Sequence, residues 1–321
     1  MKHLIHSRHH PHLKKRALLE LVGLAILVLI SVSQWEIVQE AIRTVSSVNA
    51  VWLVLLMSCY WLILPLTAFS YRLISPKPKK VKISTTTLAH LAGAGPGRII
   101  PGGIGNLSIG AMHLKKTGLT IEKAVAVVAT NNLIGVLVTI TLVITAFIIR
   151  PETFVLLEQA LTSQQLIFLA ILLVGIAVLV QWLFHARGTR REANKTLKEW
   201  KKLGRYFIKK PLNVWKAVFI AIIITLVHTF MLDFAGFAVG VDVKILDALI
   251  ALSLGVALGG ILPTPGGFGG VEAGTSAALI VLGYDAATAT SIALLFRIAT
   301  YWQPLIPGTF AYLYLRERKL L

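Results

Sequence analysis

Four charged residues lie inside apolar parts of the sequence: Arg98, Asp233, Glu272 and Arg297. A charged side chain at the centre of a bilayer costs at least a few kcal/mol unless it is paired or reached by water. Arginine binds phosphate through two parallel hydrogen bonds, and half-helix N-termini favour anions. We therefore predict a lipid headgroup site in which Arg98 and Arg297 hold a phosphate. In this site Glu272 faces a cationic group, carries a proton or holds Arg297 in place.

The same residues have a structural interpretation. Glu272 with Arg297, and Asp233 with Arg98, would form ion pairs that lock a helix bundle, and both interpretations can hold together. Asn132 is also assigned to the headgroup site, because it lies at the same depth of its span as Arg297 and matches it in the repeat described below.

The composition decides which elements must position these residues. The chain has 321 residues, of which 56% are hydrophobic and only 14% charged, whereas soluble domains carry about 25% charge. We expect an all-α polytopic membrane protein with a basic, His-rich cytoplasmic tail (1–16) and one transmembrane domain (17–316). About six transmembrane helices are predicted, at 17–33, 50–71, 122–149, 164–184, 214–237 and 286–315.

Two further apolar stretches, about 85–114 and 246–282, are interrupted by glycine and proline. The arms of the first have 8 and 11 residues, too few to cross a hydrocarbon layer of roughly 30 Å at about 1.5 Å per residue. We predict two re-entrant half-helix hairpins, although a broken spanning helix remains an alternative for the second. Their tips would be Pro101, Gly102, Gly103 and Gly105 in the first, and Pro265, Gly266, Gly267 and Gly269 in the second.

The basic residues predict the orientation. If both hairpins return to the side they entered, 27 of the 32 Lys and Arg face the side of the N-terminus, and three face the other side. Cytoplasmic loops collect Lys and Arg, so both termini should be cytoplasmic, in the plasma or inner membrane. This split also accounts for the net charge of +18 without a nucleic-acid partner.

The two hairpins resemble each other. The tip Pro101–Gly105 matches Pro265–Gly269 at an offset of 164 residues, and 118–124 matches 283–289 at an offset of 165. Three predicted spans lie between the hairpins, so the second copy would be inverted. Inverted repeats with broken helices are a transporter architecture, and the two tips would line one polar cavity. The alternative is a tightly packed, glycine-rich crossing with no cavity.

The segment 187–213 has apolar residues at spacings of three and four among basic ones. This pattern predicts an amphipathic helix on anionic inner-leaflet lipids; the alternative is a solvated connector. The membrane-surface residues would be Trp200, Lys201, Lys202 and Arg205.

Other chemistry finds little support in the sequence. The five histidines of the tail lack acidic or cysteine partners, and there is no phosphate-binding loop or nucleotide motif. We expect no metal, no cofactor and no catalytic residue.

The segments Arg98–Asn106 and Leu262–Glu272, followed by Leu295–Arg297, resemble the lysylphosphatidylglycerol synthetase transmembrane-region family. This is the flippase-like membrane domain of the multiple peptide resistance factor, which is linked to antibiotic resistance. The resemblance implies a bundle with re-entrant helices and movement of phosphatidylglycerol, or an aminoacylated derivative, between leaflets. Members often have Glu where this chain has Asn106, which weakens the case for a cationic lipid. The aminoacyl-transferase domain of two-domain members is absent from this sequence, so lysyltransferase activity is not expected.

The sequence therefore favours a phospholipid flippase or scramblase over an enzyme. Two alternatives stay open: a membrane subunit that recruits a lipid- or glycan-modifying enzyme through 187–213, and a membrane-embedded lipid transferase with Glu272 as base. The lipid, its direction, the energy coupling and homo-oligomer formation are left open.

Overall fold

The computed structural model describes residues 43, 48–99, 104–160, 198–199, 201–202, 204–205, 207–261, 264 and 266–321. Within these ranges the chain is helical and contains no strand. The α-helices are α3 (Ala50–Ile74), α4 (Ile83–Ala94), α5 (Ile104–Lys116), α6 (Ile121–Ile149), α7 (Pro151–Ala160), α10 (Pro211–Ala238), α11 (Ile245–Ile261), α12 (Gly270–Val281), α13 (Ala286–Arg297) and α14 (Leu305–Glu317). Short 3-10 helices, η1 (Pro78–Lys80) and η2 (Pro96–Ile99), and a π-helix, η3 (Ile298–Trp302), complete the order.

Three of these helices, α3, α6 and α10, are long and apolar enough to cross a membrane. Their starts are defined by local signals: the side chains of Asn49 and Thr120 cap α3 and α6, and Pro211 opens α10, positions where such residues stabilise a helix. The predicted spans at 50–71, 122–149 and 214–237 correspond to these helices. The tail and the predicted spans at 17–33 and 164–184 lie outside the described residues.

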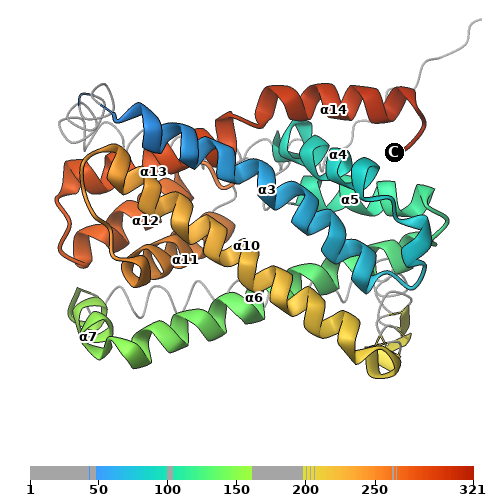
Figure 1. Ribbon diagram of the computed structural model, residues 1–321, viewed down its shortest axis with the longest axis horizontal. Helices are drawn as coiled ribbons and strands as arrows, with labels where there is room; N and C mark the ends of the chain where they lie inside the picture. Colours follow the sequence, from blue (N-terminus) through green and yellow to red (C-terminus); the bar gives the residue numbers. More distant parts are fainter. Residues whose placement is uncertain are drawn as a thin grey trace, which may run out of the picture.

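Helices α3 and α10 pack side by side in opposite directions through the middle of the molecule (Figure 1). At one end the Asn49 amide donates to the Ala238 carbonyl at 2.8 Å. At the other end the Asn213 side chain donates to the Leu73 carbonyl at 3.5 Å. The buried faces of both helices belong to the largest apolar core, so this crossing pair forms the centre of the fold.

Two packed helix pairs, α4–α5 and α11–α12, lie at opposite ends of the long axis (Figure 1). They occupy the stretches where the sequence predicts hairpins. Helices α4, α5 and α12 have 12, 13 and 12 residues, fewer than the about 20 needed to span. Whether the pairs re-enter a membrane, and whether they form an inverted repeat, stay predictions.

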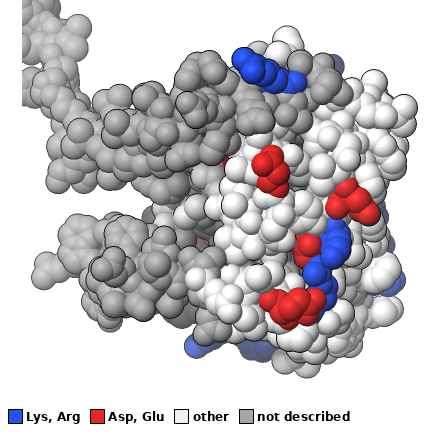
Figure 2. Space-filling view, turned by 90° about the vertical axis from the view of Figure 1, so that its left-hand side faces the viewer, with Lys and Arg blue, Asp and Glu red and all other residues white. Residues whose placement is uncertain are grey.

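We call the end of each helix pair that lies away from its connecting segment the base of the pair. Helix α6 runs from the base of α4–α5 to the base of α11–α12. It has 29 residues, about 43 Å of helix. Near its start the Lys77 ammonium donates to the Gly118 carbonyl, and just after its end Arg150 pairs with Asp247 of α11. We call the first side the basic end, because it carries Lys77, Lys79, Lys80, Lys82, Lys115, Lys116 and Lys123. The other side is the acidic end, with Glu152, Asp242, Asp247 and Asp285. Figure 2 shows several acidic side chains on this face, with basic ones between them.

The last predicted span differs from the expectation. The sequence suggests one helix over 286–315, bent near Pro304 and Pro307, but α13 already ends at Arg297, and the five-residue π-helix η3 separates it from α14. Pro304 occupies the N-cap position of α14, and Pro307 lies in the first turn of this helix, where a missing N–H costs little. The prolines therefore start a new helix instead of bending an old one. Helix α7, a short helix after α6, was not predicted.

Close packing of α11 on α12 depends on Gly255. A Cβ at this position would lie 2.0 Å from the Thr275 hydroxyl oxygen and 2.8 Å from the Val271 carbonyl oxygen. We expect Gly255→Ala to destabilise the protein by about 1–3 kcal/mol through overpacking, measured by thermal unfolding in detergent. Gly260→Ala is the matched control, because nothing lies within 4 Å of a Cβ there. Equal unfolding temperatures for the two variants would contradict the prediction.

Candidate functional site

Arg297 and Glu272 form a nearly buried ion pair. The Arg297 Nε lies 2.8 Å from Glu272 Oε1, and the side chains are 9% and 14% exposed. Arg297 is the last residue of α13, and Glu272 lies in the first turn of α12, where the helix dipole favours a carboxylate. A second guanidinium nitrogen of Arg297 donates to the Gly266 carbonyl at 3.2 Å. The pair thus connects the last helices with the segment that precedes α12.

Arg98 reaches the same place from the other helix pair. It lies in η2, between α4 and α5. One guanidinium nitrogen donates to the Thr300 carbonyl of η3 at 2.6 Å, and Tyr60 of α3 forms a side-chain hydrogen bond with Arg98. Because η3 replaces the regular α-helical bonding, its carbonyls lie within reach of a side chain from another element.

The ring of Tyr301 joins the two arginines. The guanidinium carbons of Arg98 and Arg297 lie 4.7 and 4.5 Å from its centroid, within the range of favourable cation–π contacts. Gly266 packs against the same ring: a Cβ there would lie 2.6 Å from Tyr301 Cε2 and 3.4 Å from the Cβ of Arg98. The segment between α4 and α5 and the segment between α11 and α12 therefore meet here. We call Arg98, Gly266, Glu272, Arg297 and Tyr301 the arginine cluster.

The arginine cluster holds two guanidinium groups and one carboxylate, so it carries a net positive charge. Two of its polar atoms, Nη1 of Arg98 and Oε2 of Glu272, are buried and have no hydrogen-bond partner among the described residues. Buried polar groups are normally paired. The free donor suits an oxygen of an anion, and the free acceptor suits a hydroxyl or ammonium group of the same ligand.

Asn132 and Asp233 lie elsewhere, although the sequence assigns both to the site. Asn132 is exposed on α6, and its amide donates to the Val128 carbonyl of its own helix at 3.1 Å. The proposed ion pair between Asp233 and Arg98 does not form: Arg98 contacts the carbonyl and ring of η3, and Oδ1 of Asp233 is buried and has no partner among the described residues. The π-helix η3, which the sequence did not predict, supplies Arg98 with these other contacts.

Several predicted residues fall outside the described ranges: Pro101, Gly102, Gly103, Pro265 and Trp200. Of the predicted tip glycines, Gly266, Gly267 and Gly269 adopt positive φ angles, which only glycine adopts readily. Gly105 passes so close to Gly97 that a Cβ would lie 2.1 Å from its carbonyl oxygen. Lys201, Lys202 and Arg205 are exposed helical residues, and Lys202 pairs with Glu199.

Three residues that contact the arginines were not predicted from the sequence: Tyr60, Thr300 and Tyr301. Only Tyr301 carries a detectable signal, because it follows Arg297 by four residues and would share its face on a regular helix. The roles of Tyr60 and of the Thr300 carbonyl depend on tertiary packing, which no local pattern indicates.

Comparison with known proteins agrees with this architecture. No curated protein matches the chain. Residues 18–308 match the family model described as the lysylphosphatidylglycerol synthase TM region. That range includes the three apolar spans, both helix pairs and the whole arginine cluster. The chain is thus a membrane-integral protein related to lipid modification or flipping, and it belongs to the lysylphosphatidylglycerol synthase transmembrane-region family.

Proposed function

We propose that this protein moves a phospholipid between the leaflets of the cell membrane, as a flippase or scramblase. The observation that carries the proposal is the arginine cluster. Two guanidinium groups contact one tyrosine ring, and among the described residues one carboxylate, that of Glu272, offsets their charge. One excess positive charge matches the single negative charge of a phosphodiester, and arginine binds phosphate oxygens in a directed way.

Each part of the cluster has a role in this proposal. The free Nη1 of Arg98 and the guanidinium of Arg297 hold the phosphate oxygens. The free Oε2 of Glu272 accepts a hydrogen bond from the headgroup, for example from a glycerol hydroxyl or an ammonium group. The headgroup crosses through the polar interior while the acyl chains stay in the bilayer.

The helix arrangement supports an alternating-access architecture. We infer that α4–α5 and α11–α12 are two re-entrant hairpins of an inverted repeat within a bundle of six spans. Their bases lie at opposite ends of α6, and α3 and α10, which precede them, run in opposite directions. Non-helical backbone at membrane depth is stable only where protein or water covers it, and the tip segments cover each other at Gly266 and Arg98.

The charges support an orientation with the basic end in the cytoplasm. Both termini are then cytoplasmic. In this orientation the exposed basic residues Lys201, Lys202 and Arg205 lie near the inner leaflet, where anionic lipids attract them.

The test is lipid movement in proteoliposomes. The purified protein is reconstituted with fluorescent phosphatidylglycerol or phosphatidylethanolamine, and a membrane-impermeant reductant bleaches the outer leaflet. We expect wild type to expose most of the labelled lipid, and Arg98→Lys and Arg297→Lys to slow this at least tenfold, because lysine cannot bind phosphate in the bidentate manner. The matched control is Asn132→Ala, at the exposed position outside the cluster, which should keep the wild-type rate.

Two results would overturn the proposal. If folded wild type moves neither lipid, under an imposed pH gradient or without one, the cluster does not serve lipid transport. If the recovered lipid is chemically altered, a membrane-embedded transferase replaces the flippase. Equal losses in Asn132→Ala and in the arginine variants would also contradict a headgroup role for the cluster.

A further inference from the structure

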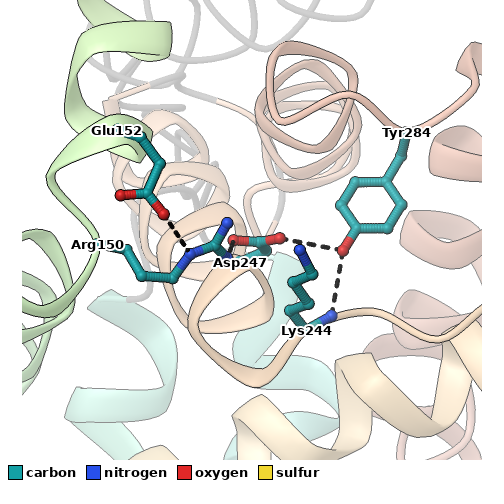
Figure 3. A network of polar contacts seen from close by, with 5 residues as sticks. All are labelled: Arg150, Glu152, Lys244, Asp247 and Tyr284. Carbon is teal, nitrogen blue, oxygen red and sulfur yellow. Dashed lines mark hydrogen bonds and ion pairs between the residues drawn. The ribbon is translucent and has the colours of Figure 1, made fainter.

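A polar network at the acidic end ties three elements together (Figure 3). Arg150, which directly follows α6, donates to Oδ1 of Asp247 in the first turn of α11 at 2.7 Å. The hydroxyl of Tyr284, in the turn between α12 and α13, donates to Oδ2 of Asp247 at 3.1 Å. The same hydroxyl accepts from the backbone amide of Lys244 at 3.1 Å, and Glu152 pairs with Arg150 from the outside at 3.0 Å.

Asp247 is the centre of this network. It is 3% exposed, and both of its carboxylate oxygens are occupied. Burial raises the pKa of Tyr284 to about 12, so the hydroxyl keeps its proton and remains a donor. Charge-assisted hydrogen bonds out of water hold strongly, and removing one partner leaves an uncompensated buried charge. The network therefore fixes the base of the α11–α12 pair to the end of α6.

A second network occupies the corresponding place at the basic end. His113, near the end of α5, is 2% exposed. Its Nδ1 lies 3.0 Å from the Leu320 carbonyl oxygen, and its Nε2 lies 3.2 Å from the Thr86 hydroxyl oxygen at the start of α4. A carbonyl oxygen only accepts, so Nδ1 carries a hydrogen. This network fixes the base of the α4–α5 pair to the segment that follows α14.

The two networks share one connectivity. Helix α6 follows the α4–α5 pair in the chain, but its end is tied to the base of α11–α12. The α13–α14 unit follows α11–α12, but the segment after it is tied to the base of α4–α5. Each helix pair is thus held at its base by the helix that follows the other pair. The helices of one pair could pack on each other without these contacts to the other part of the chain. The contacts therefore couple the α4–α5 part of the protein to the α11–α12 part.

The apolar contact between α6 and the base of α11 is small. It has three buried members, Ala146, Leu249 and Ile250, and four partly buried residues pack against them: Leu142, Val143, Phe147 and Leu246. Helices α11 and α12 also pack on each other along their length. The carbonyl of Gly266, in the segment that connects them, accepts a hydrogen bond from Arg297. If the network at its base opens, the pair can move away from α6 as a unit, which exposes the arginine cluster toward the acidic end.

We propose that these two networks are the gates of the transport cycle. The acidic-end clamp (Arg150, Asp247, Tyr284) and the basic-end clamp (Thr86, His113, Leu320) each hold one helix pair closed, and release of one clamp opens the arginine cluster to that end only. This assignment rests on the proposed lipid transport, but the movement of the pairs can be measured separately from it.

The test uses distances between spin labels in the full chain. Cys59 is replaced by Ser, and label pairs are placed on exposed residues: Ile148 and Leu254 report α6 against α11, and Ser84 and Leu313 report α4 against α14. Pulsed electron paramagnetic resonance gives the distance distributions in detergent and in liposomes. We expect Asp247→Asn to shift the α6–α11 distribution to longer distances and to leave the α4–α14 distribution unchanged.

Further variants keep the test decisive. Arg150→Met should lengthen the α6–α11 distance like Asp247→Asn, and Arg150→Lys, which keeps the charge, should restore most of the wild-type distribution. Glu152→Gln, at the 59% exposed outer partner, is the matched control and should change nothing. His113→Phe should shift only the α4–α14 pair, and by less than Asp247→Asn shifts the α6–α11 pair, because α4 and α14 also pack on each other at Gly95 and Gly308.

The outcomes separate the gate from the transport proposal. Unchanged distributions in folded Asp247→Asn and Arg150→Met would overturn the gates, and so would a change in both label pairs after either substitution, since the clamps would then be general stabilising contacts. If each substitution opens only its own end but wild type moves no lipid, the gates stand and the transported substrate must be another molecule.

Discussion

The Glu272→Gln variant should unfold in detergent well below the wild-type temperature, with a loss of about 3–5 kcal/mol in the free energy of unfolding. The reason is that Arg297, only 7% exposed, would keep its charge and lose its carboxylate partner. Arg297→Gln should cost a similar amount, because Glu272 is then the uncompensated charge. Tryptophan fluorescence during heating, or denaturant titration in micelles, measures both losses.

The double variant Glu272→Gln/Arg297→Gln decides how the pair acts. Two neutral amides can hydrogen-bond each other, so the double variant should be more stable than the sum of the two single losses predicts. Glu152→Gln is the control, since an exposed ion pair contributes at most about 1 kcal/mol. Strict additivity of the single losses would mean that the 2.8 Å contact carries no coupling energy. Recovered stability without lipid movement would separate bundle locking from headgroup binding within the same pair of residues.

The sequence predicted the continuous helices well, because a long apolar segment in a bilayer satisfies its backbone hydrogen bonds by forming a helix. Helices α3, α6 and α10 lie within a few residues of the predicted spans. The sequence also located both helix pairs, since proline and glycine interrupt the apolar stretches there and end each helix. It placed a bend of the last span near Pro304 and Pro307, close to the turn before α14, but it did not predict the π-helix that follows Arg297, because the prolines mark only the start of α14.

The site was predicted only in part, for a physical reason. Arg98, Glu272 and Arg297 were recognised because charge in an apolar segment needs a partner. Asp233 was assigned to Arg98 by charge alone, but the arginine has other acceptors in η3. Asn132 matches Arg297 in the sequence repeat, yet it faces away from the protein. A repeat specifies the order of helices, whereas the direction of a side chain depends on the rotation of each helix.

Replacing Tyr301 by Leu should abolish most lipid movement, although Tyr301 is not charged and was not among the predicted site residues. The ring contacts both guanidinium groups, at 4.7 and 4.5 Å, and each contact is worth about 0.5–2 kcal/mol. Without the ring, like charges on Arg98 and Arg297 lose the surface that holds them together. A loss of about 1.4 kcal/mol in headgroup binding corresponds to a tenfold weaker affinity, so we expect at least a tenfold slower bleaching of labelled phosphatidylglycerol.

Tyr301→Phe is the matched control, because phenylalanine keeps the aromatic face that the guanidinium groups contact and should retain most of the wild-type rate. If Phe and Leu fail equally, the hydroxyl of Tyr301 matters and the ring does not. If Leu is as active as wild type, the two arginines do not need a common surface, and each must act alone. The aromatic residue is therefore the sharpest probe of the cluster, because its replacement removes the surface that both guanidinium groups contact and leaves both arginines unchanged.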